Sequence, residues 1–353
     1  MEEKWRENLI KIEPYVAGEQ SKSPNLIKLN ANENAYPPSP KTKEVLENFN
    51  IAKLRKYPDA MGEPLKSTLA EYYGLKKEQI FVGNGSDDVL AAAFRAFFNS
   101  DKPIFYPDIT YSFYPVWCDL MKVPYELKKL NDDFTINTED YHAENGGVIF
   151  PNPNAPTSIG MGLDKVRDIL DHNQDVIVVI DETYVDFGGE TALPLLDEYK
   201  NLVITRTFSK SRSLAGMRLG FAMASEELVS YMNAVKDSYN TYPLDTVAMA
   251  VGTASVKDEK YFRDTLDKII KTREKISKEL EELGFEVFPS QTNFLFTKHK
   301  TAKSVDIFEY LKTKEIFIRH FSAPRVNEYL RITVGTDEEM EKMMTEIKKF
   351  LEK

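Results

Sequence analysis

The chain of 353 residues is longer than a single hydrophobic core usually supports, so its length predicts one large domain and a smaller one. Hydrophobic residues make up 42% and charged residues 29% of the chain, and the net charge of −10 gives no support to broad binding of nucleic acid or anionic membranes. Cys118 is the only cysteine, which excludes an intrachain disulfide and favours a reducing, cytoplasmic compartment.

The N-terminal stretch, MEEKWRENLI, has acidic residues near its start and lacks the apolar core of a signal peptide. No apolar run reaches the roughly 20 residues of a membrane span. Residues 1–35 form an irregular arm, and helices are predicted over 39–49 and 63–74. Each helix has a proline near its start, Pro40 and Pro64, and Gly74 ends the second.

The middle of the chain alternates short apolar segments with predicted helices. The apolar segments cover residues 80–82, 147–150, 176–180 and 202–205. Uninterrupted apolar strands between helices predict a parallel sheet covered on both faces. A polar motif follows each strand, at the carboxyl end where open α/β sheets bind ligands. These motifs are GNGSDD (83–88), PNPNAPTS (151–158), DETYVDF (181–187) and TFSKSRSLAGMRLGF (207–221).

The last hundred residues show a different pattern. A long amphipathic helix is predicted over 261–284 and a final helix over 336–353, where Thr336 and Glu339 form a capping box. Strands are predicted over 285–288, 293–297, 316–320 and 329–334. The expected division is an arm (1–35), a large domain (36–248) and a small C-terminal domain (249–353), with the arm packed on the small domain.

The polar motifs together meet the needs of one cofactor, pyridoxal phosphate (PLP). Its aldehyde bonds to a lysine amine, which Lys210 supplies, and its pyridine nitrogen pairs with a buried carboxylate, Asp181. Tyr184 is placed to turn its hydroxyl toward the same ring. Asn154 is an amide donor in a loop that three prolines make rigid. Taken alone, each motif also fits an ordinary turn, helix cap or packed aromatic residue.

The phosphate of PLP needs N–H groups, hydroxyls and a cation. The residues predicted to supply them are Gly85, Ser86, Asp87, Thr207, Ser209 and Arg218. Arg212, in the same stretch as Lys210, is interpreted as a surface residue. The four histidines show no metal-ligand spacing, so no metal site is expected.

These motifs resemble those of fold-type I PLP-dependent aminotransferases and, within them, the histidinol-phosphate aminotransferases. The resemblance covers nearly the whole chain and includes LNANENAYPPSP (29–40), KYPD (56–59), PDITYSFY (107–114) and YLRITVGT (329–336). It implies a mostly parallel central sheet with helices on both faces and a smaller α+β C-terminal domain. Alternation along 329–334 independently places Arg331 on the strand face opposite the core side chains.

The resemblance also implies further roles. Tyr111 stacks on the ring, and Tyr57 reaches the phosphate of the partner subunit's cofactor, which implies a homodimer with shared active sites. Arg331 and Arg319 bind the substrate anion, with Tyr15 nearby. In one departure from the family pattern, Ala155 stands where an asparagine usually meets the ring oxygen. Either Asn154 takes over that contact or Tyr184 makes it alone.

The implied reaction is reversible transamination between L-histidinol phosphate and 2-oxoglutarate, giving imidazole-acetol phosphate and L-glutamate. An aromatic amino-acid aminotransferase and a PLP decarboxylase of the threonine-phosphate type remain alternatives, because they use the same cofactor. A cofactor-binding regulator is disfavoured, since the chain has no spare length and no basic recognition region for DNA. A nicotinamide dehydrogenase is disfavoured because no Gly-x-Gly-x-x-Gly follows a strand.

Overall fold

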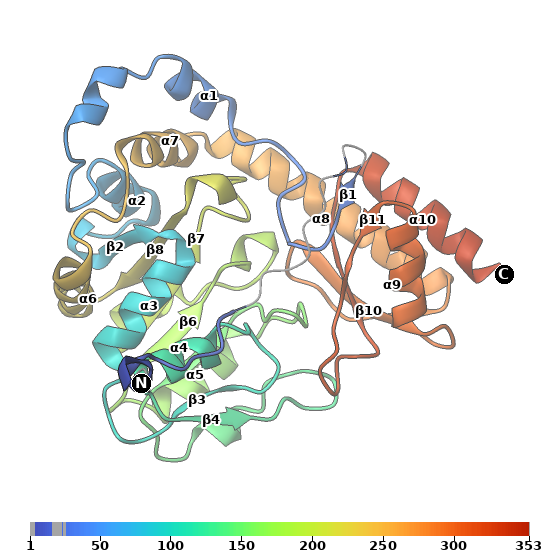
Figure 1. Cartoon of the computed structure of the whole chain (residues 1–353), viewed down its shortest axis with the longest axis horizontal. Helices are drawn as coiled ribbons and strands as arrows, with labels where there is room; N and C mark the ends of the chain where they lie inside the picture. The colour runs from blue at the N-terminus through green and yellow to red at the C-terminus, as the bar shows by residue number, and fades with distance from the viewer. Residues whose placement is uncertain (1–3, 16–22, 24–25, 353) are drawn as a thin grey trace.

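A seven-stranded sheet forms the centre of the larger part of the molecule (Figure 1). The computed structural model describes residues 4–15, 23 and 26–352. The strand order is β2-β8-β7-β6-β5-β3-β4, and only β8 runs antiparallel to its neighbours. The strands are β2 (Ile80–Asn84), β3 (Ile104–Pro107), β4 (Tyr125–Lys128), β5 (Val148–Pro151), β6 (Val178–Asp181), β7 (Leu202–Thr207) and β8 (Leu219–Ala224). The predicted, mostly parallel sheet is confirmed.

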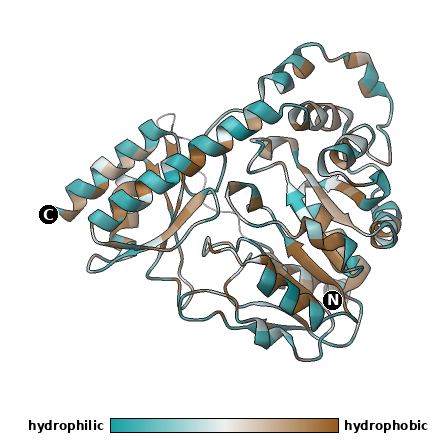
Figure 2. Cartoon of the chain, turned by 180° about the vertical axis from the view of Figure 1, so that it is seen from behind, coloured by the Kyte–Doolittle hydropathy of each residue, from teal (hydrophilic) through white to brown (hydrophobic). Residues whose placement is uncertain are grey.

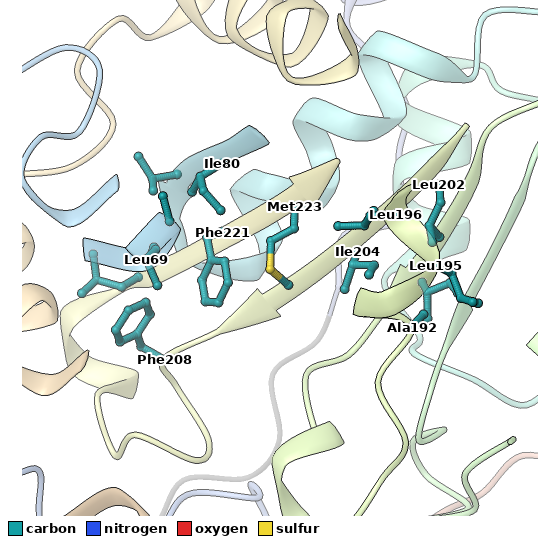
Figure 3. Packing of buried hydrophobic residues seen from close by; sticks show 14 of the residues in the cluster. Leu69, Ile80, Ala192, Leu195, Leu196, Leu202, Ile204, Phe208, Phe221 and Met223 are labelled. Atoms are coloured by element: carbon teal, nitrogen blue, oxygen red, sulfur yellow. The ribbon is translucent and has the colours of Figure 1, made fainter. Parts of the chain in front are cut away.

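Helices cover both faces of this sheet. They are α1 (Pro40–Glu47), α2 (Leu65–Tyr73), α3 (Gly85–Phe97), α4 (Tyr114–Met121), α5 (Leu163–Asp171), α6 (Glu226–Tyr239) and α7 (Thr246–Val256). Ile180 and Ile204 face a layer that includes α2, α5 and α7, part of which Figure 3 shows. Val179 and Val203 face the opposite layer of α3, α4 and α6. Burial on both faces explains why these strands are apolar throughout.

A smaller α+β unit follows, with α8 (Glu259–Glu282) as the long helix that reaches it from the large sheet (Figure 1). Its antiparallel sheet has the order β12-β13-β10-β9. The elements are β9 (Phe285–Val287), β10 (Phe294–His299), α9 (Ser304–Thr313), β12 (Arg319–His320), β13 (Leu330–Thr333) and α10 (Asp337–Leu351). The predicted capping box of Thr336 and Glu339 is present at the start of α10. In Figure 2, α8 and α10 carry alternating polar and apolar bands, as amphipathic helices do.

The part of the N-terminal arm from Ile27 onward joins this smaller unit, whereas Tyr15 stacks on Phe113 beside α4 of the large part. Strand β1 (Ile27–Lys28) pairs in parallel with β11 (Ile316–Phe317), and Leu29 is buried in the core of the small unit. Residues 1–3, 16–22 and 24–25 of the predicted arm lie outside the described residues. The short 3-10 helices are η1 (Lys4–Asn8), η2 (Ile51–Arg55), η3 (Lys77–Gln79), η4 (Thr138–Tyr141), η5 (Val185–Phe187), η6 (Leu193–Asp197) and η7 (Ala215–Met217). Within the described ranges, no helix is long and apolar enough to cross a membrane.

The packing of α7 bears on the domain boundary. Ala248, Met249 and Val251 belong to the same core as the large sheet, although residues from 249 onward were assigned to the small domain. Helix α8 then carries the chain across, because Ile276 and Leu280 lie in the core of the small unit. The division at 248/249 stays a prediction, and we propose a boundary nearer Asp258, the residue before α8.

Candidate active site

The ends of β6 and β7 present side chains to one common side. Side chains alternate along a strand, so Asp181 continues the row of Val179, and Thr207 continues the row of Val203. Both valines face the layer of α3, α4 and α6. Asp181 and Thr207 therefore lie where the sheet ends on the side of α3.

Asp181 is buried, with 4% of its surface exposed. Its Oδ1 accepts hydrogen bonds from the Thr183 hydroxyl at 2.6 Å and the Thr183 backbone N–H at 3.1 Å. Burial raises the pKa of this carboxyl to about 6, and no cation in the described part of the chain forms an ion pair with it. A buried carboxylate without a cationic partner suits a ligand that brings a protonated nitrogen.

The turn before α3 makes close backbone contacts with the start of β8. Gly85 has φ +79°, and a Cβ added there would lie 2.5 Å from Nη2 of Arg218. A Cβ added at Gly220 would lie 2.6 Å from the backbone nitrogen of Ser86. Only glycine fits at either place, so the first N–H groups of α3 and the Arg218 guanidinium meet in one cradle. Such a cradle suits an anion like phosphate.

Hydroxyl groups approach this cradle from β7. Thr207 pairs with Gly220 in the β7–β8 ladder, and its Oγ1 donates to Oγ of Ser209 at 3.0 Å. Asp87 joins the same region from α3, because its carboxylate lies 3.3 Å from Arg218 Nη2 and accepts the Tyr111 hydroxyl at 2.9 Å. Burial and then the charge of Asp87 raise the pKa of Tyr111, so its hydroxyl stays protonated. The predicted phosphate-binding residues are thus brought together.

Residues 31–34 cover Lys210 and Tyr184. The Lys210 ammonium lies 3.3 Å from the carbonyl oxygen of Ala31, and Asn34 Nδ2 donates to the Lys210 carbonyl at 2.9 Å. Asn32 Nδ2 donates to Tyr184 Oη at 2.9 Å. Because the phenol oxygen already accepts this bond, its own hydrogen remains to be donated elsewhere. The sequence reasoning missed Asn32, although the motif LNANEN that contains it was part of the resemblance.

Asn154 does not provide a free amide donor. Its Nδ2 donates to the carbonyl of Ile109 and to the Thr157 hydroxyl, both at 2.9 Å, and its Oδ1 accepts from Thr110 at 3.1 Å. The Asn154 amide therefore ties its own loop to the loop that follows β3. The expectation that Asn154 replaces the asparagine missing at Ala155 is not supported, and Asn32 with Tyr184 is the better candidate pair.

Arg331 is a half-buried arginine whose guanidinium has few partners among the described residues. Leu330 and Ile332 lie in the core of the small unit, which agrees with the placement of Arg331 on the opposite strand face. Its Nη2 donates to the carbonyl of Asn30 at 2.9 Å, whereas its Nε has no partner. Burial lowers the pKa of Arg331, and no carboxylate in the described segments forms an ion pair with it. A guanidinium with an unpaired N–H group and no carboxylate partner in the described segments suits an anion.

Aromatic rings place Arg331 beside the other site residues. Phe294 packs edge-on against Tyr184, with ring centroids 5.1 Å apart, and the Arg331 guanidinium lies 5.4 Å from the Phe294 centroid. Arg319 is paired with Arg331 across β12 and β13, so two cations approach this side of the site. Tyr15 stacks on Phe113 at 4.8 Å.

Phe113 also contacts Tyr111, with ring centroids 6.0 Å apart, so the arm residue Tyr15 lies next to the predicted ring-stacking residue. Tyr57 is the exception among the predicted residues. It is 82% exposed and stacks on Tyr242 at 4.8 Å, away from the residues around Asp181.

The interpretation of Arg212 as a surface residue is wrong. It is only 7% exposed, donates from Nη1 to the carbonyl of Ser255 at 2.8 Å, and lies 4.0 Å from the ring centroid of Phe262. The end of α7 and the start of α8 cover it. These partners lie more than 40 residues away along the chain, so the local pattern did not reveal them.

One cluster of metal-ligand type, His142, Asp168 and His172, occurs in the described part of the chain despite the scattered histidine spacing. His142 and His172 stack at 3.5 Å, and His172 Nδ1 lies 2.8 Å from the backbone oxygen of Asp168, at the end of α5. Hydrogen bonding and helix capping account for this arrangement. The elements that carry it, η4 and α5, contribute none of the site residues above.

The chain is similar to known proteins over nearly its whole length. Residues 24–347 match the family described as "Aminotransferase class I and II". The histidinol-phosphate aminotransferase of Lactococcus lactis subsp. cremoris (strain MG1363) is 47% identical over 98% of this chain and 98% of its own length. That of Acinetobacter baylyi is 49% identical over 98% of this chain and 97% of its own length. The chain belongs to the histidinol-phosphate aminotransferase family.

The fold of this chain is also found in solved structures. A histidinol-phosphate aminotransferase from Sinorhizobium meliloti, solved in complex with pyridoxal-5'-phosphate, superposes with a TM-score of 0.84 at 22% identity and covers 92% of this chain and 91% of its own. The family is PLP-dependent, and the residues here fit that cofactor. The buried carboxyl of Asp181 lacks a cation, the glycine cradle before α3 suits a phosphate, and Lys210 lies beside Tyr184, its Nζ 6.0 Å from the ring centroid.

Proposed function

We propose that the chain catalyses PLP-dependent transamination between L-histidinol phosphate and 2-oxoglutarate, giving imidazole-acetol phosphate and L-glutamate in histidine biosynthesis. The observation that carries the proposal is the 47–49% identity, over nearly the full length, to proteins named for this activity. The half-buried guanidinium of Arg331, whose Nε lacks a partner among the described residues, supports it, since both substrates are anions.

When bound, PLP withdraws electrons from the substrate carbon that loses a proton. In the proposed site, Lys210 would hold the cofactor through its Nζ, and as a free amine it would move the proton of the substrate carbon. Asp181 holds the ring nitrogen in its protonated form, and Tyr184 donates to the ring oxygen while Asn32 orients its hydroxyl. The cradle of Gly85, Ser86, Asp87, Thr207, Ser209 and Arg218 holds the phosphate, and Tyr111 lies against the ring.

One site must accept both the carboxylate of glutamate and the phosphate of histidinol phosphate. Guanidinium groups match either anion with two parallel hydrogen bonds, so Arg331 and Arg319 serve both half-reactions. Tyr15, which stacks on Phe113, closes the same region from the arm. The two substrates therefore share the arginines, and the remaining site residues contact different parts of each substrate.

We expect Arg331→Lys to raise the KM for both glutamate and histidinol phosphate by about 10–100-fold, because lysine cannot bind an anion in the two-pronged manner of arginine. Steady-state kinetics with each substrate measures this. Arg263→Lys, at an exposed arginine of α8, is the matched control and should leave both values unchanged. A rise for only one substrate would contradict a shared anion site.

Single-turnover absorbance measurements test the reaction itself. Glutamate should convert the cofactor of the loaded enzyme, and imidazole-acetol phosphate should restore it. Turnover on histidinol phosphate is then compared with turnover on phenylalanine and threonine phosphate. Preference for phenylalanine would favour an aromatic aminotransferase, and CO2 release from threonine phosphate would favour a decarboxylase.

We also propose a homodimer in which Tyr57 serves the partner subunit's site. Supporting this, the stretch from Ile51 to Tyr57 carries large exposed side chains: Ile51 is 76%, Leu54 54% and Tyr57 82% exposed. Small-molecule substrates are the other partners. The buried, free Cys118 is consistent with a proposed cytoplasmic location, where thiols stay reduced.

Subunit mixing tests the shared site. Lys210→Ala and Tyr57→Ala homodimers should each have low activity, but a mixed dimer has one site with both changes and one with neither. Random reassembly should therefore restore about a quarter of wild-type activity, from one intact site in half of the dimers. If Tyr57 acts within its own subunit, or the protein is a monomer by sedimentation, mixing restores nothing.

A further inference from the structure

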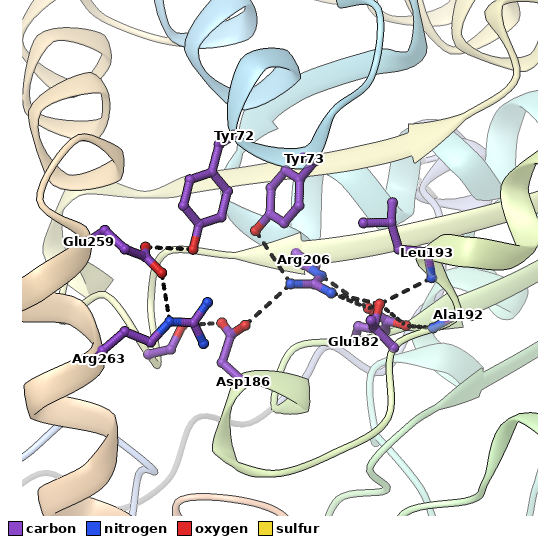
Figure 4. A network of polar contacts seen from close by, with 11 residues as sticks. Tyr72, Tyr73, Glu182, Asp186, Ala192, Leu193, Arg206, Glu259 and Arg263 are labelled. Atoms are coloured by element: carbon purple, nitrogen blue, oxygen red, sulfur yellow. Dashed lines mark hydrogen bonds and ion pairs between the residues drawn. The ribbon is translucent and has the colours of Figure 1, made fainter.

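A connected set of polar side chains lies behind the proposed cofactor site, and we call it the rear network. Its members are Glu182, Asp186, Arg206 and Ser211. Figure 4 shows Arg206 between Glu182 and Asp186. Three members are direct chain neighbours of cofactor residues: Glu182 follows Asp181, Arg206 precedes Thr207, and Ser211 follows Lys210. Asp186 lies two residues after Tyr184.

Strand alternation explains why the two sets are separated. Ile180 and Ile204 face the layer of α2, α5 and α7, and Glu182 and Arg206 continue the same rows. Asp181 and Thr207, one residue away on each strand, face the other side. A movement of Glu182 or Arg206 therefore moves a cofactor residue directly, because each pair shares a peptide bond.

The hydrogen bonds of the network are short, and all its members are buried except Asp186, which is half-buried. Arg206 Nη2 lies 2.7 Å and its Nε 3.0 Å from Glu182 Oε2, and the two side chains are 7% and 0% exposed. Arg206 Nη1 lies 3.2 Å from Asp186 Oδ1, and Asp186 Oδ2 accepts the Ser211 hydroxyl at 2.6 Å. Glu182 also accepts the backbone N–H of Ala192 at 2.6 Å. Hydrogen bonds thus run from the end of β6 to the residue after Lys210.

The loop after Lys210 is held from further sides. Asn34 donates to the Lys210 carbonyl, and Arg212 is fixed by the Ser255 carbonyl and the Phe262 ring. With Ser211 tied to Asp186, three successive residues of the loop have fixed partners. Several independent contacts therefore fix the backbone that carries Lys210.

Stability alone does not explain a buried ion network. Removing two charges from water costs about as much as their mutual attraction returns, and apolar replacements are often as stable. Specification of one geometry is a better-supported use of such groups. We propose that the rear network is a positioning device, which sets Asp181, Thr207 and Lys210 relative to one another before cofactor or substrate binds.

Ser211→Ala tests this by removing one hydrogen bond while leaving the ion pairs in place. We expect kcat for transamination to fall about fivefold, with KM within about twofold, because the loss acts on the geometry of Lys210 and not on substrate binding. In the cofactor-free protein, amide hydrogen exchange in residues 208–212 should become faster. Asp186→Asn also weakens the contact to Arg206, so it should lower kcat and speed amide exchange in residues 208–212 more than Ser211→Ala does.

Ser225→Ala is the matched control, because it removes a serine hydroxyl that caps α6 and touches no member of the network. It should lower the melting temperature slightly and leave kcat and loop exchange unchanged. The proposal fails if Ser211→Ala changes only the melting temperature, as the control does. This inference rests on the proposed function, but hydrogen exchange in the cofactor-free protein needs no substrate, so its outcome is separable from a failure of the assigned reaction.

Discussion

Lys210→Ala is expected to lower kcat for transamination by at least about a thousandfold, since it removes both the covalent attachment and the group that carries the proton. The rate at which glutamate converts the bound cofactor in a single turnover measures this loss of activity. Borohydride reduction of the loaded wild-type protein, followed by peptide mapping, should place the reduced adduct on Lys210.

Lys129→Ala is the control, because Lys129 is an exposed lysine of the same domain and should retain full activity. An adduct on any lysine other than Lys210 would overturn the site assignment. Full conversion by the Lys210→Ala protein would overturn the mechanism as well.

Asp181→Asn is expected to lower kcat by on the order of a hundred- to a thousandfold, because a neutral amide of the same size does not stabilise a protonated ring nitrogen. The shape of the site is preserved, so the fold and substrate KM should change little. Asp119→Asn, at an exposed position on α4, is the matched control. Activity within tenfold of wild type would show that Asp181 does not pair with the ring.

The same variant has an effect on stability with a definite sign. The Asp181 pKa of about 6 in the folded protein lies above its ordinary value of 3.8, so the folded state binds this proton more tightly than the unfolded state. The contribution of this bound proton to the free energy of unfolding is fully present below about pH 4 and is lost as pH rises through 6. The loss amounts to about 3 kcal/mol in the cofactor-free protein.

Chemical denaturation of the cofactor-free protein checks this. Relative to wild type, Asp181→Asn should gain free energy of unfolding as pH rises from 4 to 7. If the free energies of unfolding of the two proteins change with pH in the same way, burial does not raise the pKa of Asp181. Bound cofactor should abolish the difference, because it supplies the missing cation.

Much of the site was predictable because its residues belong to local patterns. Asp181 directly follows one apolar segment and Lys210 comes five residues after another, and parallel strands bring their carboxyl ends to one edge. Gly85, the first residue of α3, predicted a tight turn. The alternation around Arg331 predicted which face of the strand Arg331 occupies. Each of these inferences needed only neighbours within a few residues.

Other residues were assigned incorrectly or missed because their partners are distant in the chain. The Asn32 amide meets Tyr184 across 152 residues, and Arg212 meets Ser255 across 43. The Asn154 amide is consumed by Ile109, 45 residues earlier. In each case a polar side chain had several plausible partners, and packing selected one.

The sequence by itself therefore determined the alternation of apolar strands with helices in the middle of the chain, the cofactor class and the strand face on which Arg331 lies. These properties follow from periodicity and from residue chemistry, which act over a few residues. Only the tertiary structure decided which amide reaches Tyr184, that Arg212 is buried, and that an ion network backs the site on the opposite face of the sheet. Those outcomes depend on long-range packing, where burial makes every polar group take a specific partner.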